Sequence, residues 1–108
     1  MRADDQTVVR VLRALADTRR FRMVERIAAA GELSCGQIAE LFDLSQPTIS
    51  HHLKLLGDAG VLTIRHDAKH RFLSVDHDLL ARVFGTIPAR FARPKRRRVP
   101  RRRVTDVQ

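Results

Sequence analysis

The feature that most constrains the fold is a pair of short helical patterns, separated by one tight turn, within residues 34–59. Ser34 opens a Ser-x-x-Gln capping box, which predicts a helix over residues 35–42. Ser45 is expected to cap a second helix over about residues 46–59. Two short helices joined by so few residues predict a helix-turn-helix.

The turn and the second helix have residues that suit this arrangement. Asp43 lies in the turn, and aspartate tolerates the left-handed backbone found in tight turns. Pro47 lies in the first helical turn, where the amide that proline lacks has no partner to lose. The apolar residues of the second helix share one face and should anchor it on the body; they are Ile49, Leu53 and Leu56. A helix anchored in this way can present its polar face to a DNA major groove.

Two further helices are expected before the motif. Apolar residues at helical spacing predict the first of them; they are Val8, Val11, Leu12 and Leu15. The second covers residues 18–30, begins at the cap Asp17 and ends at Gly31. Its predicted apolar stripe is Phe21, Val24, Ile27 and Ala28. On the helix over residues 35–42, the residues expected to face the core are Ile38, Ala39, Leu41 and Phe42.

After Gly60 the pattern changes to strands. Two β-like runs, residues 61–64 and 71–75, flank a polar segment with a basic tip and predict a hairpin. A last helix is expected from about Asp76 to near Pro88, with the apolar residues Leu79, Leu80, Val83 and Phe84. The order is three helices, a recognition helix, two strands and a helix. The predicted fold is therefore mainly α with a β-hairpin wing, a winged helix-turn-helix.

The positive charge of the chain is concentrated at one end. The formal net charge is +9, and residues 90–108 carry nine Lys or Arg with one Asp, whereas residues 1–89 carry 12 Lys or Arg against 11 Asp or Glu. We predict a DNA-binding and dimerisation domain over residues 1–87 and a basic, disordered tail over residues 88–108. Such a tail attracts polyanions without reading their sequence, so it could bind DNA or RNA.

Two groups of residues are candidates for contact with double-stranded DNA. On the second helix of the motif, the polar residues not needed for packing are Gln46, Thr48, Ser50, His51 and Lys54. Glutamine pairs with adenine edges, whereas a lysine further along the helix is suited to phosphate. In the wing, the expected contacts are Arg65, Lys69, His70 and Arg71. A solvated helix face and a solvated hairpin tip are the alternative interpretations.

Several stretches of this chain form a specific combination. They are Leu15-Ala16-Asp17-Thr18-Arg19, Ile38-Ala39-Glu40, the run from Ser45 to Leu56, and Asp58-Ala59-Gly60-Val61-Leu62. On these residues the chain resembles the ArsR/SmtB family of winged-helix repressors over residues 12–75. The resemblance implies a homodimer whose interface is formed by the first and last helices. It also implies binding to an inverted-repeat operator over a promoter, and release when an inducer binds.

The metal-sensing positions of that family are not matched. Many members bind metal through Cys-x-Cys at the start of the third helix, where Cys35 here occupies the spacer between two non-cysteine residues. Others use Asp and His on the last helix with a later His pair, but no His follows His77. One cysteine cannot build a thiolate-rich site, so we expect no metal and no cofactor. A redox role for Cys35 and a looser metal site at His66, His70 and His77 are alternatives.

Other classes of protein lack support in the sequence. No apolar run reaches the length of a membrane span, and the polar N-terminus is unlike a secretory signal, so we expect a cytoplasmic protein without a membrane partner. No nucleophile motif or glycine-rich phosphate loop indicates an enzyme. We predict a sequence-specific DNA-binding regulator, a dimeric repressor that is uninduced or answers a non-metal signal. The alternative is a structural DNA- or RNA-binding protein driven by the arginine-rich tail.

Overall fold

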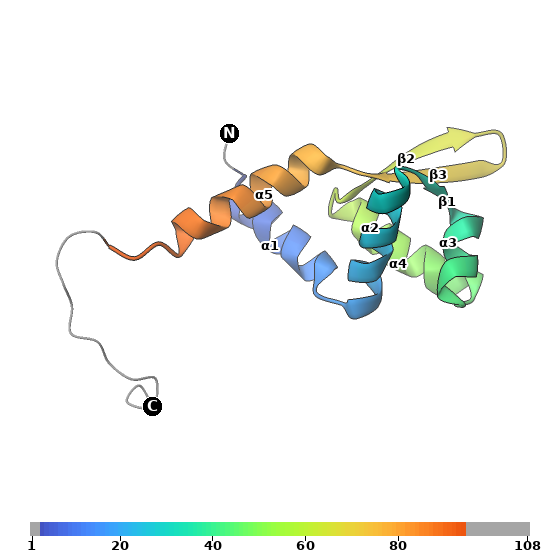
Figure 1. Ribbon diagram of the computed structural model, residues 1–108, viewed down its shortest axis with the longest axis horizontal. Helices are drawn as coiled ribbons and strands as arrows, with labels where there is room; N and C mark the ends of the chain where they lie inside the picture. The colour runs from blue at the N-terminus through green and yellow to red at the C-terminus, as the bar shows by residue number, and fades with distance from the viewer. Residues whose placement is uncertain (1–2, 95–108) are drawn as a thin grey trace, which may run out of the picture.

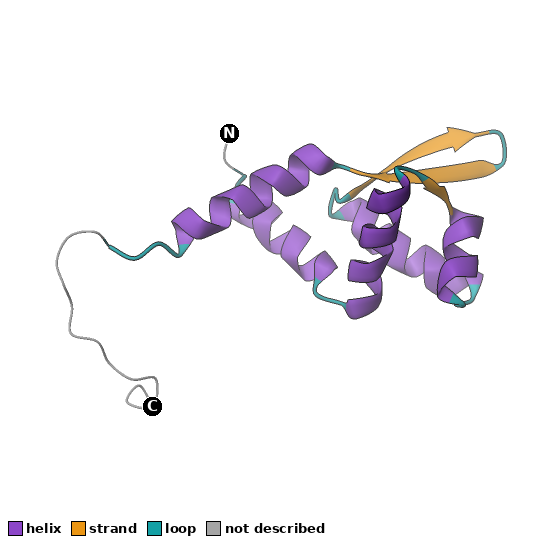
Figure 2. Cartoon of the chain, in the orientation of Figure 1, coloured by secondary structure: helices purple, strands orange, loops and turns teal. Residues whose placement is uncertain are grey.

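The computed structural model describes residues 3–94, which form helices around a small antiparallel sheet (Figures 1 and 2). In chain order the elements are α1 (Asp5–Leu15), α2 (Thr18–Ala30), β1 (Leu33–Ser34), α3 (Cys35–Phe42), α4 (Gln46–Asp58), β2 (Leu62–Asp67), β3 (His70–Val75) and α5 (His77–Arg90). The strand order in the sheet is β1-β3-β2. The predicted winged helix-turn-helix and its element order are confirmed, with one short strand added.

The helix boundaries follow from the capping residues. The Asp17 carboxylate accepts hydrogen bonds from the amides of Arg19 (2.9 Å) and Arg20 (3.0 Å), which starts α2. Gly31 ends that helix with φ +85°, a left-handed conformation that costs glycine little. Asp43 ends α3 with φ 50° and ψ 46°, as expected for the residue in the turn. These local signals were readable in the sequence and are confirmed.

The wing differs from its prediction in length. The strands were expected over residues 61–64 and 71–75, but the pairing runs from Leu62 opposite Val75 to Asp67 opposite His70. Ala68 and Lys69 alone make the turn, and Ala68 has φ 55°. Polar residues continue the ladder because the outer part of the wing has both faces in solvent, so no apolar alternation is needed there.

The core lies among the helices, where α4 contacts α1, α2 and α3. Its fully buried side chains come from all parts of the domain and include Val11, Met23, Ile27, Ile38, Ile49, Leu56, Val61, Leu73 and Val83. Three residues expected to face the core are instead exposed: Phe21, Ala28 and Leu41. α2 has more apolar residues than one face can bury. Packing against the neighbouring helices buries the face that contains Met23 and leaves Phe21 and Ala28 in solvent.

The two ends of the described chain meet at α1 and α5, which lie side by side at the end of the molecule opposite the wing (Figure 1). α5 runs through Pro88 to Arg90, past residue 87, where the domain boundary was expected. Arg90 Nη1 donates to Asp5 Oδ1 (2.7 Å) and Nη2 donates to the Ala3 carbonyl (3.2 Å). The predicted disordered tail lies, from residue 95 on, outside the described residues.

Candidate nucleic-acid interface

The helix-turn-helix is held in shape by hydrogen bonds at the start of each helix. In the capping box of α3, Ser34 Oγ accepts from the Gln37 amide (3.1 Å) and Gln37 Oε1 accepts from the Ser34 amide (2.8 Å). At the start of α4, Ser45 Oγ accepts from the Thr48 amide (3.4 Å) and forms a hydrogen bond with Thr48 Oγ1 (2.9 Å). Each cap satisfies amides that a helix start leaves without partners.

The two faces of α4 differ sharply. One face is buried and carries Ile49, His52, Leu53 and Leu56. The other exposes four of the candidate DNA-contacting residues, Gln46, Ser50, His51 and Lys54. Gln46, Ser50 and Lys54 recur every fourth residue and so line up along the helix. α4 therefore offers solvent a polar row whose side chains can all donate hydrogen bonds.

Two candidate residues of α4 are already engaged within the fold. Thr48 is half-buried, and its hydroxyl is bonded to Ser45, so it acts as part of the cap. Lys54 Nζ donates to Asp58 Oδ2 at 2.9 Å, and both side chains are exposed. An exposed pair of this kind contributes little to stability, so phosphate can replace the carboxylate as the partner of Lys54.

His52, on the buried face of α4, helps to hold this helix on the rest of the domain. The side chain is buried, and Arg20 Nη1 lies 3.4 Å from His52 Nδ1. A guanidinium can only donate, so this hydrogen bond requires Nδ1 as the acceptor, which a neutral imidazole provides. Burial lowers the pKa of His52, although the nearby Asp17 carboxylate opposes this effect. Arg20 Nε also donates to the Ala14 carbonyl (2.8 Å), which links α4 through Arg20 to the end of α1.

The wing is fixed to the body through Arg65, a contact that the sequence did not reveal. Arg65 donates to both oxygens of Glu32, from Nε at 3.1 Å and from Nη2 at 2.8 Å. Its guanidinium also lies 4.5 Å from the centre of the Phe72 ring and 3.6 Å from Asp67 Oδ2. The hydrogen bond from Arg65 lowers the pKa of Glu32, so the pair stays charged near neutral pH. Arg65 is thus mainly a link between the wing and the segment before β1.

The remaining wing candidates have no such internal role among the described residues. Lys69 lies in the turn, and His70 and Arg71 follow it on β3, all with exposed side chains. Lys69 and His70 lie at the tip, away from α4, whereas Arg71 is further back along the strand. In the sequence these residues form one group of basic side chains. Only the strand register shows that Lys69 and His70 lie at the tip of the wing and that Arg71 lies closer to its base.

A hollow of about 470 Å³ lies between α4 and the wing, and it brings several candidates together. Ser50 and Lys54 line it from α4, Arg71 lines it from β3, and Ile64 lines it from β2. Cys35, at the start of α3, is half-buried and also lines it. A polyanion lying in this concavity would contact the helix and the wing at the same time.

Other kinds of site receive no support from the described part of the chain. Within residues 3–94, no group of three or more His, Cys, Asp and Glu side chains is placed to hold a metal ion. Among the helices described, none is long and apolar enough to cross a membrane.

Comparison with known proteins gives a consistent set of relatives. The sequence profile of a helix-turn-helix domain matches residues 4–65. The HTH-type transcriptional regulator YceK of Bacillus subtilis (strain 168) is 32% identical over 77 residues, which are 70% of this chain and 77% of that protein. The arsenical resistance operon repressor of Staphylococcus aureus is 34% identical over 70 residues, 65% of this chain and 66% of that protein.

A solved structure agrees with these sequence relatives. It is the solution structure of a homodimeric winged helix-turn-helix DNA-binding domain from Mycobacterium bovis, described as a possible ArsR-family transcriptional regulator. The two structures superpose with a TM-score of 0.65 at 26% identity, over 78% of this chain and 77% of that one.

Proposed function

The chain belongs to the ArsR family of winged helix-turn-helix transcriptional regulators, and we propose that it is a dimeric repressor that reads an inverted-repeat operator with α4 and the wing. Relatives named as repressors support this assignment. A repressor of this kind binds chromosomal DNA, so we propose that the protein is located in the cytoplasm.

The observation that carries the proposal is the concave surface between α4 and the wing. Ser50 and Lys54 face the same hollow as Arg71. Gln46 and His51 are exposed on α4 next to this surface. We assign base contacts to the polar residues near the start of α4, and phosphate contacts to the cations, because short polar side chains let a helix approach base edges closely.

Exposed apolar residues on α1 and α5 support the proposed dimer. Val9 and Leu12 are 49% and 38% exposed on α1, and Phe84 is 44% exposed on α5. Phe91, just beyond α5, is 82% exposed. A patch of this kind on two adjacent helices would be covered by the same patch of a second copy, the arrangement of a two-fold symmetric interface.

The proposed mechanism is steric. The two copies of α4 would enter successive major grooves about one helical turn apart, so that the occupied operator excludes polymerase. The signal that releases the protein is proposed to be other than a metal held by thiolates, because the chain has a single cysteine. An uninduced autorepressor is the alternative within the same function.

The base-reading role of α4 is tested by Gln46→Ala with His51→Ala, in the full-length chain. Affinities for an operator obtained by selection and for a scrambled duplex are measured by fluorescence anisotropy at fixed salt. We expect discrimination to fall by about tenfold or more, because a good base contact contributes about 1–3 kcal/mol of discrimination. Lys54→Gln should weaken binding to both duplexes alike, since phosphate contacts carry no sequence information.

The control removes two polar side chains elsewhere without changing the net charge. Arg19→Ala with Glu25→Ala changes two exposed residues on α2, outside α4, the wing and the helices of the proposed dimer interface. This variant should keep its discrimination. Full discrimination in the α4 variant as well would overturn the assignment of base contacts to α4.

A further inference from the structure

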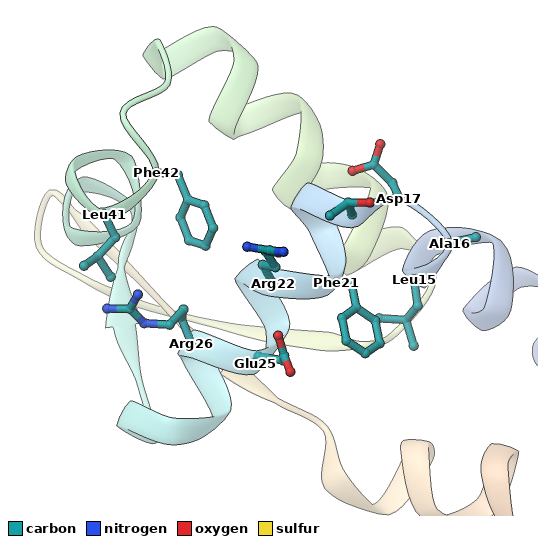
Figure 3. Close-up of a pocket in the computed structure, with 10 residues that line it drawn as sticks. Leu15, Ala16, Asp17, Phe21, Arg22, Glu25, Arg26, Leu41 and Phe42 are labelled. Carbon is teal, nitrogen blue, oxygen red and sulfur yellow. The ribbon is translucent and has the colours of Figure 1, made fainter.

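The face of the molecule formed by α2 and α3 holds a second hollow, of about 800 Å³, which plays no part in the proposed DNA contacts (Figure 3). We call it the α2–α3 groove; its walls are formed mainly by Phe21, Arg22, Glu25 and Arg26 of α2 and by Leu41 and Phe42 of α3. We propose that this groove is a binding site for an organic anion with an elongated apolar body, such as an aryl or alkyl carboxylate.

The apolar walls are exposed where the sequence pattern would have them buried. Phe21 is 50% exposed and Leu41 is 44% exposed, although each lies on a helix that has a buried face. Solvent exposure of a large aromatic ring and a leucine on the two sides of one groove is unfavourable in free energy. They provide the apolar lining that small-molecule sites require.

The charged walls select an anion. Figure 3 shows the guanidinium group of Arg26 extended toward Leu41 of α3, and that of Arg22 apart from it, on the Phe42 side of the groove. Within residues 3–94 neither arginine forms an ion pair. The two are one helical turn apart, so their side chains lie on the same face of α2, and rotation of these flexible side chains would let both bind one carboxylate.

The acidic residues of the groove do not occupy this position. Asp17 is committed as the cap of α2, where it accepts from the amides of Arg19 and Arg20. In Figure 3 the Glu25 carboxylate lies on the Phe21 side of the groove, away from Leu41. A carboxylate ligand would therefore lie against Arg22 and Arg26 on the side away from Glu25.

The shape of the groove favours an elongated body. A further hollow of about 530 Å³ shares Arg26 and Leu41 with it and continues toward Ala30 and Leu33. An apolar chain attached to the anion can extend in that direction along α2. The volumes are those of sites for small molecules, which usually measure about 300–1,000 Å³.

A ligand bound in the α2–α3 groove would affect the proposed DNA-binding surface. α3 is the first helix of the helix-turn-helix and packs on α4, so a ligand that bridges α2 and α3 acts on the support of the recognition helix. If the operator also binds one spacing of these helices better than another, such a ligand changes operator affinity, and DNA changes ligand affinity by the same factor. This consequence, unlike the site itself, rests on the proposed DNA-binding function.

The site is tested by NMR on the full-length, nitrogen-15-labelled protein, with 4-phenylbutyrate as the probe. We expect saturable shifts of amides in residues 15–26 and 41–42. The neutral analogue 4-phenylbutanol should bind at least about tenfold more weakly, because it lacks the charge-assisted hydrogen bonds. Arg22→Gln with Arg26→Gln should weaken binding of the acid by a similar factor and leave that of the alcohol unchanged.

The control variant, Arg19→Gln with Arg82→Gln, removes the same charge from exposed positions outside the groove and should bind 4-phenylbutyrate as the wild type does. Absence of saturable shifts, or equal binding of acid and alcohol, would overturn the proposal. So would concentration-dependent broadening of the groove amides without probe, since that would identify a protein–protein contact there.

Coupling to DNA is measured separately, as operator affinity with and without saturating probe. A change in the wild type that is absent in the Arg22→Gln, Arg26→Gln variant supports an effector role. Unchanged operator affinity with a saturated groove would overturn the effector role but leave the binding site. Lack of any operator binding would instead contradict the proposed function, and the NMR result would still stand.

Discussion

Gly60 joins the recognition helix to the wing, and its replacement by alanine tests the packing at that junction. Gly60 has φ +86°, and a Cβ placed there would lie 3.0 Å from Leu79 Cδ2 on α5. Gly31, at the end of α2, has nearly the same φ of +85°, but a Cβ there would meet no atom within 4 Å. The two substitutions therefore separate the cost of backbone strain from the cost of side-chain crowding.

The expected magnitudes follow from these surroundings. Alanine in a left-handed backbone costs about 1–2 kcal/mol, and Gly31→Ala should lose about that much of its free energy of unfolding. At Gly60 the strain is joined by crowding against the end of the Leu79 side chain, which is buried and would have to shift within the core. Overpacking of this kind costs about 1–3 kcal/mol, so Gly60→Ala should lose about 2–5 kcal/mol in total.

The assay is urea unfolding followed by circular dichroism, at one protein concentration for all variants because dimerisation contributes to apparent stability. Gly36→Ala is the control: Gly36 lies within α3, its nearest neighbour would be Ser34 Oγ at 4.0 Å, and alanine there should be neutral or stabilising. If Gly31→Ala and Gly60→Ala lose the same free energy of unfolding, crowding against Leu79 does not contribute. If neither variant loses free energy of unfolding, the left-handed φ at these glycines is wrong.

Three other predictions concern the cap, the buried histidine and the tail. Ser34→Ala should cost about 1 kcal/mol of unfolding free energy by urea titration, because the Gln37 amide loses its acceptor, and a loss below about 0.5 kcal/mol, the low end for N-caps, would contradict the capping box. Because burial lowers the pKa of His52 in the folded state, the unfolded chain binds the proton more readily. The free energy of unfolding should therefore fall as the pH drops from about 7.5 to about 5.5, and His52→Gln should flatten that slope while the exposed His51→Gln should not. Deleting residues 93–108 should reduce the dependence of DNA affinity on salt, and an unchanged slope would mean that the tail does not touch DNA.

The parts of the fold that could be predicted are those with local causes. Ser34, Ser45 and Asp17 cap helices through neighbours two or three residues away, and Asp43 adopts its turn conformation by itself. Signals of this range are visible in the sequence, which is why the helix boundaries and the helix-turn-helix were predicted correctly.

The parts that could not be predicted depend on residues far apart in the chain. Glu32 and Arg65 are 33 residues apart, and only the pairing of β3 with both β1 and β2 brings them together. Leu33 and Ser34 form a strand too short to give any alternating pattern. Phe21 was expected in the core because its spacing fits an apolar stripe, but contacts with other helices decide which face of α2 is buried.

The candidate site was predictable as a list of residues but not as a surface. The exposed row on α4 follows from the helical repeat, so Gln46, Ser50 and Lys54 could be grouped in advance. That Arg71 shares a hollow with Ser50 and Lys54, while Arg65 is bound to Glu32, depends on the register of the wing. The DNA contacts themselves remain predictions.

The proposed operator binding is tested most directly by selection of random double-stranded DNA with the purified full-length protein at physiological salt, followed by sequencing. We expect an enriched motif with two-fold symmetry and half-sites about one helical turn apart, as a symmetric dimer with two copies of α4 requires. Enrichment of no motif, with binding that depends only on salt, would contradict the proposed operator binding and would assign the affinity to charge alone.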